Sequence, residues 1–349
     1  MQLASSMADQ ELPPPSHVVP LDFDSVETVP ESHSWPDSNG LSSTDEKVTI
    51  PLIDLVDDNA SELIGRACEQ WGMFQLTNHG VPETLIAEAE KEARRLFDLP
   101  TRQKMMALYS SDSVTGYGMA VISKYYQKYM WHEGFTILGS PVDDAKKLWP
   151  SEYKHFCDVM EEYQIQMRAL ADKIIRLVFK FLDISEQVIE KLSPSSNDVG
   201  QLYTALRLNS YPPCPDPSQV MGLAAHTDTS LFTILHQARI DGLQVFKDEV
   251  GWIPLSPMSG TLVVNIGDLL HILSNGRFRS ILHRVVIQGK EHRLSMAYFY
   301  YPPNELYISP HCNPLSESPQ TPLYRCVKVR EYFSMKAKNM GRGLSTIKI

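Results

Sequence analysis

The 349-residue sequence lacks any run of about eighteen apolar residues, so it predicts no membrane-spanning helix. It lacks a basic start followed by an apolar stretch, so we expect no secretory signal peptide. Its five cysteines form no CxxC pair, which favours reduced thiols in the cytoplasm, with the nucleus as a further compartment. No long block of like charges is present, and the net charge of −10 argues against a nucleic-acid partner.

What is present is an ordinary globular composition, with 43% hydrophobic and 21% charged residues. Residues 1–46 are rich in Pro, Ser, Asp and Glu and show no sustained period, so we expect a flexible N-terminal arm. Residues 47–199 predict a helical region that contains a long amphipathic helix over 151–182. Within this region residues 110–150 are predicted to be irregular, as in a lid or binding loop.

The pattern changes to short β-branched or aromatic runs, separated by Gly, Pro and Asn, in residues 200–305. Such a series predicts a double-sheet jelly roll. The C-terminal segment, residues 306–349, contains a further predicted helix over 327–340. We therefore expect the α+β class with a mainly β core, a helical N-terminal half and a C-terminal helix.

A metal site is predicted from three side chains. His226 and Asp228 stand two residues apart in the strand-like LAAHTDTS, so both point to one face, and His283 begins the β run HRVVI. Two histidines and one carboxylate on one face of an octahedral ion are typical of non-haem Fe(II) oxygenases. Zinc is less favoured, because HExxH and paired cysteines are lacking. Asp268 with His271 is a rival pair, although GDLL predicts a turn in which Asp268 caps backbone donors.

An anion site is predicted beside the metal. Arg293 and Ser295 share one face of a strand, and a buried Arg is costly unless it meets an anion. A dicarboxylate would supply one through a two-pronged pair, with the serine hydroxyl as a further donor. The alternative is a surface Arg on an edge strand. Arg207, Asn209 and Tyr211 alternate at period two, so Tyr211 can donate to a 2-oxo acid, and Asn209 can hold a neighbouring group or the strand itself.

A lone HxD pair is common by chance, so the accompanying motifs carry the argument. These motifs are HTD and the later His with RLS, NSYPPCP, WGMFQLTNHGVP and NIGDLLHILSNGRFRSILHRVV. Through them the chain resembles the plant 2-oxoglutarate-dependent dioxygenases over about residues 48–335. This resemblance implies a double-stranded β-helix with Fe(II) at its open mouth. It implies 2-oxoglutarate and O2 as co-substrates, succinate and CO2 as products, and ascorbate as reductant in vitro.

Within that family, GYGMAVISKYYQKYMWHEGFTILGSP and KKLWPSEYKHFCDVMEEY resemble gibberellin 3-beta-dioxygenases. The resemblance implies a small diterpenoid substrate, hydroxylated at carbon 3 to yield active hormone, and we expect a monomer. A rigid apolar cage with a carboxylate needs an aromatic pocket with one or two donors. Arg207 would meet that carboxylate, or form a salt bridge to an acidic residue of the N-terminal half. The candidate pocket walls, each of which could instead be plain core, are Tyr117, Tyr126, Trp131, Phe135 and Phe299.

Two other functions stay open from the sequence. The iron and co-substrate motifs do not separate this reaction from oxidation of gibberellin at carbon 2 or of a flavonoid, and only residues 113–163 favour carbon 3. A non-catalytic hormone-binding protein on the same fold would require loss of Arg293 or of a member of the metal triad. All four of these residues are present.

Overall fold

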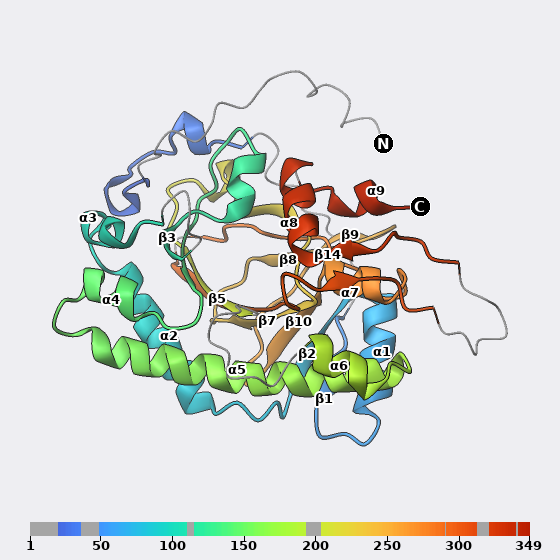
Figure 1. The fold of residues 1–349 in the computed structure, drawn as a ribbon. Coiled ribbons are helices and arrows are strands. Elements are labelled where there is room, and N and C mark those ends of the chain that lie inside the picture. The colour runs from blue at the N-terminus through green and yellow to red at the C-terminus, as the bar shows by residue number, and fades with distance from the viewer. Residues whose placement is uncertain are drawn as a thin grey trace.

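The computed structural model describes residues 20–35, 49–109, 115–192, 204–289, 291–312, 321–339 and 341–349. Within these residues the chain forms two facing sheets, and helices cover the outer side of the larger sheet (Figure 1). The expected α+β class with a jelly-roll core, a helical layer and a C-terminal helix is confirmed.

The larger sheet has eight strands in the part of the chain that the structure describes. Their spatial order is β1 (Leu52–Asp54), β2 (Met73–Thr77), β10 (Leu262–Ile266), β7 (Phe232–Gln237), β12 (Arg293–Tyr300), β5 (Thr204–Tyr211), β4 (Glu133–Ile137) and β3 (Gly116–Gly118). The smaller sheet contains β6 (Leu223–His226), β11 (His283–Val285), β8 (Leu243–Lys247) and β9 (Gly251–Pro254). A two-stranded ribbon pairs β13 (Tyr307–Ile308) with β14 (Val327–Lys328).

The two faces of the larger sheet bury different side chains, because residues alternate along each strand. On β5, Leu206 and Leu208 belong to the apolar cluster that the sheet shares with the helices. Arg207, Asn209 and Tyr211 have the opposite parity and face the smaller sheet, where Tyr211 joins the second apolar cluster. The space between the sheets therefore receives the polar side chains predicted for the site.

The helices of the outer layer run along the first face, with the 29-residue α5 at its centre (Figure 1). Its buried residues recur at helical spacing, as predicted for 151–182, and it packs against α1 and α2. The α-helices are α1 (Ala60–Gln70), α2 (Glu83–Phe97), α3 (Thr101–Lys104), α4 (Val142–Leu148), α5 (Tyr153–Phe181), α6 (Glu186–Leu192), α7 (Asp268–Leu273), α8 (Val329–Lys338) and α9 (Gly343–Ile347). Short 3-10 turns are η1 (Phe23–Ser25), η2 (Glu31–His33), η3 (Met105–Ala107), η4 (Val121–Tyr125) and η5 (Pro217–Gln219).

The prediction of an irregular segment over 110–150 is wrong for much of its length. Two of its stretches form β3 and β4, which extend the larger sheet beyond β5, and a third forms α4. All five residues of β4 are buried because the strand lies between two others. Residues 110–114 lie outside the described part. The region expected to be helical, 47–199, thus also supplies four strands of the sheet.

The turn predicted for GDLL is also wrong, because these residues begin α7. Asp268 is the first residue of that helix, and the N-cap position before it is Gly267, which has no side chain to cap with. Its carboxylate instead accepts hydrogen bonds from Ser280, Tyr332 and Lys336. Distant partners outcompete the local backbone donors that the sequence suggested.

Residues 20–35, part of the expected arm, pack against the jelly roll. Leu21 and Phe23 contact the apolar cluster between the sheets, and the Phe23 ring lies 5.0 Å from that of Trp131. His33 is buried nearby. Because these apolar side chains are packed, residues 20–35 do not form part of a flexible arm as predicted. The rest of the arm, residues 1–19 and 36–46, lies outside the described residues.

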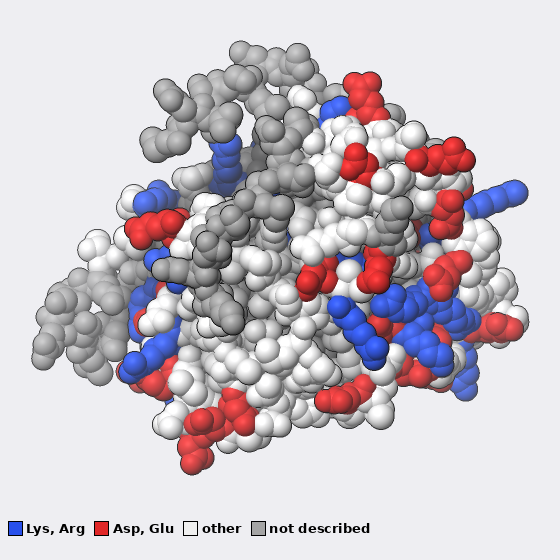
Figure 2. All heavy atoms as spheres, turned by 180° about the vertical axis from the view of Figure 1, so that it is seen from behind, with Lys and Arg blue, Asp and Glu red and all other residues white. Residues whose placement is uncertain are grey.

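The surface carries both signs of charge. On the face in Figure 2, Lys and Arg side chains gather at one side, with Asp and Glu side chains beside them. None of the helices in the described ranges has the length and apolar content needed to cross a bilayer. All five cysteines are free.

Candidate metal and co-substrate site

The three predicted metal ligands lie together at one end of the smaller sheet. His226 on β6 pairs directly with His283 on β11, and their ring centres are 4.3 Å apart. Asp228 Oδ1 lies 3.7 Å from Nε2 of His226 and 3.9 Å from Nε2 of His283. One ligand atom from each residue can therefore reach a single ion. The structure thus brings together the three side chains that the sequence pattern selects as metal ligands.

Backbone carbonyls fix which nitrogen each histidine presents. Nδ1 of His226 donates to the carbonyl of Ala224 at 2.8 Å, and Nδ1 of His283 donates to that of Ile281 at 3.2 Å. Because each Nδ1 carries the proton, each Nε2 holds a lone pair towards Asp228. The other carboxylate oxygen, Asp228 Oδ2, accepts from Thr233 at 2.6 Å. Such outer contacts orient metal ligands before an ion arrives.

The electrostatics of the three groups suit a divalent cation. Burial and the neighbouring His283 lower the pKa of His226 to about 3. Burial opposes ionisation of Asp228, yet the two imidazoles and the Thr233 hydrogen bond keep the pKa of its carboxyl below the usual value. At neutral pH the site thus offers neutral His226 and an anionic carboxylate, the forms that bind metals.

Other clusters are less suited to metal. The rival pair is occupied, since Asp268 bonds three side chains and His271 bonds the carbonyl of Phe278 and the hydroxyl of Tyr324. Another group joins Glu88, Glu92 and His155 on α2 and α5. Its carboxylates already pair with Lys91 and Arg95, so cations of the chain balance them.

Arg293 is buried at 3% exposure, and it takes part in none of the close ion pairs found among the described residues. Its Nε donates to the carbonyl of Ile240 and its Nη2 to Oε1 of Gln237, whereas Nη1 has no hydrogen-bond partner. β12 lies inside the larger sheet, which excludes the surface Arg on an edge strand. A buried guanidinium with an unused donor fits an anionic ligand.

The other predicted co-substrate residues surround this guanidinium. Tyr211 on β5 lies directly opposite Arg293, and Asn209 lies opposite Ser295. All four side chains are buried and share the face between the sheets. Oδ1 of Asn209 accepts from Nε2 of His132 at 3.0 Å, so the amide links β5 to the segment before β4. The structure therefore brings the four residues together.

Arg207 lies on the same face, two residues before Asn209. Its Nη1 donates to Oγ1 of Thr136 at 2.6 Å and its Nη2 to the carbonyl of Gly118 at 3.0 Å, while buried Nε has no partner. The guanidinium lies over Gly134, where a Cβ atom would collide with Nη2. The salt bridge considered for Arg207 does not occur among the ion pairs of the described residues. Burial lowers its pKa to about 10, so it stays cationic at neutral pH.

Three predicted pocket walls serve the core. Phe135 packs against Phe156 on the helical side of the sheet, so its assignment to the pocket is wrong. Trp131 is fully buried, and its indole N–H donates to the carbonyl of Pro212. Tyr117 belongs to the same helical-side cluster as Phe135, although it also borders the cavity described below. The sequence predicts an irregular segment here, whereas strand pairing fixes the side of the sheet that Tyr117 and Phe135 face.

Two other predicted walls lie near the metal ligands. The Tyr126 hydroxyl donates to the carbonyl of Ala225, directly before His226. Phe299 pairs with Thr233, the residue that bonds Asp228, and is partly buried against the cluster between the sheets. Both are therefore retained as candidate substrate contacts.

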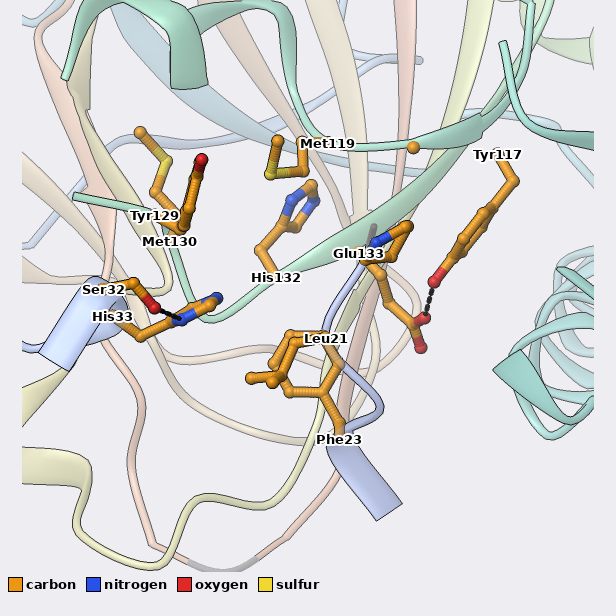
Figure 3. A pocket seen from close by; sticks show the side chains of 12 residues that line it. Leu21, Phe23, Ser32, His33, Tyr117, Met119, Tyr129, Met130, His132 and Glu133 are labelled. Atoms are coloured by element: carbon orange, nitrogen blue, oxygen red, sulfur yellow. Dashed lines mark hydrogen bonds between the residues drawn. The ribbon is translucent and has the colours of Figure 1, made fainter. Parts of the chain in front are cut away.

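The sequence reasoning missed a cavity of about 170 Å³ between residues 20–35 and the β3–β4 region (Figure 3). Leu21, Phe23, His33 and His132 are among its lining residues. His132 is 2% exposed, and its Nδ1 has no hydrogen-bond partner. His132 lies two residues before Gly134, so a strand over HEGFT would place the His132 side chain on the face between the two sheets.

Comparison with known proteins agrees with this geometry. The model of the 2OG-Fe(II) oxygenase superfamily matches residues 203–302, and that of the non-haem dioxygenase in morphine synthesis N-terminal region matches residues 50–154. Gibberellin 3-beta-dioxygenase 1 of Pisum sativum is 44% identical over 94% of this chain and 89% of its own length. Gibberellin 3-beta-dioxygenase 2 of Arabidopsis thaliana is 43% identical over 99% and 100%.

Solved structures show the same fold. A structure of JOX2 in complex with 2OG, Fe and JA has a TM-score of 0.80 at 28% identity, covering 94% of this chain and 98% of that chain. The dioxygenase for auxin oxidation in rice has a TM-score of 0.69 at 25% identity, covering 86% and 100%. On the strength of these near-full-length relatives, the chain belongs to the gibberellin 3-beta-dioxygenase family of the 2OG-Fe(II) oxygenases, which use Fe(II), 2-oxoglutarate and O2.

Proposed function

We propose that this protein hydroxylates gibberellin precursors on the beta face of carbon 3, consuming O2 and 2-oxoglutarate and releasing succinate and CO2. The observation that carries the proposal is the near-full-length similarity to gibberellin 3-beta-dioxygenases. Such relatives from Pisum sativum, Arabidopsis thaliana and Triticum aestivum are 36–44% identical over at least 93% of this chain. The intact triad and Arg293 support catalysis over passive hormone binding.

The iron site is assigned to His226, Asp228 and His283. Bound there, Fe(II) supplies the activation of O2 that attack on an unactivated C–H bond requires. The protein presents two Nε2 lone pairs and one carboxylate oxygen, fixed by carbonyls and by Thr233. These three residues would hold the ion and leave its remaining coordination positions to the co-substrates.

The 2-oxoglutarate site is assigned to the face of β12 and β5. Arg293 has an unused Nη1 donor for the distal carboxylate, and Ser295 and Tyr211 supply hydroxyl groups beside it. The ring of Tyr211 lies beneath the guanidinium and supports it without neutralising it. A dicarboxylate would provide an acceptor for this unused donor.

The substrate end of the site is assigned to Arg207 and His132. Arg207 offers its unpaired Nε to the carboxylate of the gibberellin. His132 uses Nε2 as donor to Asn209, so its neutral ring leaves Nδ1 as an acceptor for a substrate hydroxyl. The target carbon would then be held between these two groups and the metal, which is how positioning lowers the barrier.

We also propose that the enzyme acts as a cytoplasmic monomer. Its five free cysteines are consistent with a reducing compartment. Light scattering coupled to gel filtration would test the monomer, and a fluorescent fusion would test the location.

The reaction itself is tested with purified protein, Fe(II), ascorbate and 2-oxoglutarate. Gibberellins lacking the 3-hydroxyl are compared with a flavanone, and products are identified by mass spectrometry alongside succinate release. We expect a 3-beta-hydroxylated gibberellin formed in step with succinate. Product hydroxylated only at carbon 2, or faster turnover of the flavanone, would contradict the proposal.

A further inference from the structure

Asp268, at the start of α7, is a buried carboxylate with 1% exposure behind the metal triad. Its Oδ1 accepts from Ser280 at 2.6 Å, and its Oδ2 accepts from Tyr332 at 2.8 Å and from Lys336 at 2.6 Å. Tyr332 and Lys336 belong to α8. A single carboxylate thus ties the C-terminal helix to the jelly roll.

Both members of the Lys336–Asp268 pair also hold the segment that carries two metal ligands. Nζ of Lys336 donates to the carbonyl of Thr227 at 2.7 Å and to its Oγ1 at 3.0 Å. Thr227 stands between His226 and Asp228. The backbone N–H of Asp268 donates to the carbonyl of Asp228 at 2.9 Å. The segment 226–228 is therefore hydrogen-bonded to the Lys336 side chain at its centre and to the Asp268 backbone at its end.

Stability alone does not explain this arrangement. A buried ion pair commonly gives no more stability than apolar residues of the same volume would. Here the ammonium group uses its three N–H donors on Asp268 and on two oxygens of Thr227. A fully satisfied polar network of this kind fixes geometry, because any displacement leaves a buried polar group unpaired.

We propose that Lys336 and Asp268 form a clamp that positions His226 and Asp228 for the iron. The inference rests on the proposed iron site, and it makes both clamp residues positioning residues that do not touch the ion. Outer contacts of metal ligands are typically worth about tenfold to a hundredfold in metal affinity. The C-terminal helix, far from the triad in sequence, would then contribute directly to metal affinity.

The test measures binding of Co(II), without turnover, by its visible absorption, whose intensity reports coordination geometry. In Lys336→Met we expect about tenfold to a hundredfold weaker binding and an altered spectrum. This variant separates geometry from charge: it removes a cation and leaves Asp268 as an anion near the site, so electrostatics alone would tighten metal binding. Lys338→Met, at an exposed position on the same helix, is the matched control and should bind Co(II) as the parent does.

Two further variants complete the series. Asp268→Asn should bind Co(II) more weakly than Lys336→Met does, because it leaves Lys336 as an uncompensated buried cation. The double variant should recover part of that loss and remain below the parent. Thr227→Val removes one acceptor and keeps the carbonyl, so it should fold and show a smaller loss.

The outcomes distinguish failure of the clamp from failure of the proposed metal site. Lys336→Met that is folded by circular dichroism and binds Co(II) with unchanged affinity and spectrum would overturn the clamp. If Lys336→Met does not fold, parental affinity in Thr227→Val would overturn it. Retention of Co(II) binding in His226→Ala would instead overturn the metal site itself, and with it the proposed function.

Discussion

Arg293 on β12 lies directly opposite Tyr211 on β5, with the guanidinium carbon 4.9 Å from the centre of the tyrosine ring. The ring provides a cation–π contact but no counter-charge. One guanidinium nitrogen remains without a partner in this buried position. This arrangement supports the proposal that the pair receives a carboxylate of 2-oxoglutarate.

Replacing Arg293 with Met should raise the KM for 2-oxoglutarate sharply. The lost charge-assisted contact is worth about 2–4 kcal/mol, or roughly a thirtyfold to several-hundredfold change. Lysine should restore little, because it lacks the planar fork. Steady-state kinetics at saturating gibberellin provide the measurement. An unchanged KM for 2-oxoglutarate in Arg293→Met would place the anion elsewhere.

Replacing His283 with Ala should abolish turnover and leave the fold intact. The side chain supplies one metal ligand, whereas the apolar clusters on both faces of the larger sheet remain. Succinate release and circular dichroism are measured on one preparation. Full activity in this variant would refute the triad.

Arg207→Met should raise the KM for gibberellin by roughly tenfold to a hundredfold and leave that for 2-oxoglutarate nearly unchanged. The KM for a gibberellin methyl ester should change less on this substitution, since the ester has no carboxylate for Arg207 to bind. Equal losses for all substrates together with a lower melting temperature would indicate a structural role for Arg207.

Gly134→Ala tests the same proposed contact between Arg207 and the gibberellin carboxylate, but it keeps the charge of Arg207. The new methyl group would displace the flexible end of the Arg207 side chain, which lies over this glycine. We expect a higher gibberellin KM together with a loss of unfolding free energy of about 1–3 kcal/mol, because the displaced guanidinium gives up its hydrogen bonds to Thr136 and Gly118. A normal gibberellin KM in Gly134→Ala would show that the position of the guanidinium does not matter.

Stability should fall as the pH drops below the ordinary histidine range. Burial, together with the positive charge of Arg207, lowers the pKa of His132 to about 3 in the folded protein, against 6.5 when unfolded. Between those values only the unfolded chain takes up this proton, so acid favours unfolding. At pH 5 the cost from His132 is about 2 kcal/mol. The free energy of unfolding is measured by chemical denaturation at pH 7 and at pH 5. Between these two values it should fall less in His132→Gln than in the parent, and an equal fall would contradict the prediction.

Strand parity was the strongest predictor in the sequence. The period-two spacing of Arg207, Asn209 and Tyr211 placed all three correctly between the sheets, as did that of Arg293 and Ser295. The same rule would have put Phe135 on the helical side, because it is out of phase with Gly134. This strand has no local signal in the sequence, since short Gly-rich and aromatic strands form only through pairing with neighbours distant in sequence.

The polar contacts behind the site had no local signal. Lys336 stands 109 residues from Thr227 and 68 from Asp268, and the sequence predicted only a helix over 327–340. The sequence suggested a capping role for Asp268, but three distant donors occupy its carboxylate. Such partners are determined by tertiary packing, which a linear pattern does not encode.

The packing of residues 20–35 has an evolutionary consequence. This stretch contributes Leu21, Phe23 and His33 to the cavity wall but no metal ligand and no co-substrate contact. Mutations there can reshape the cavity while the iron chemistry is left untouched. With His132 of this cavity assigned to the substrate end of the site, exchanging this stretch between related oxygenases is a route by which substrate preference can change while His226, Asp228 and His283 are kept.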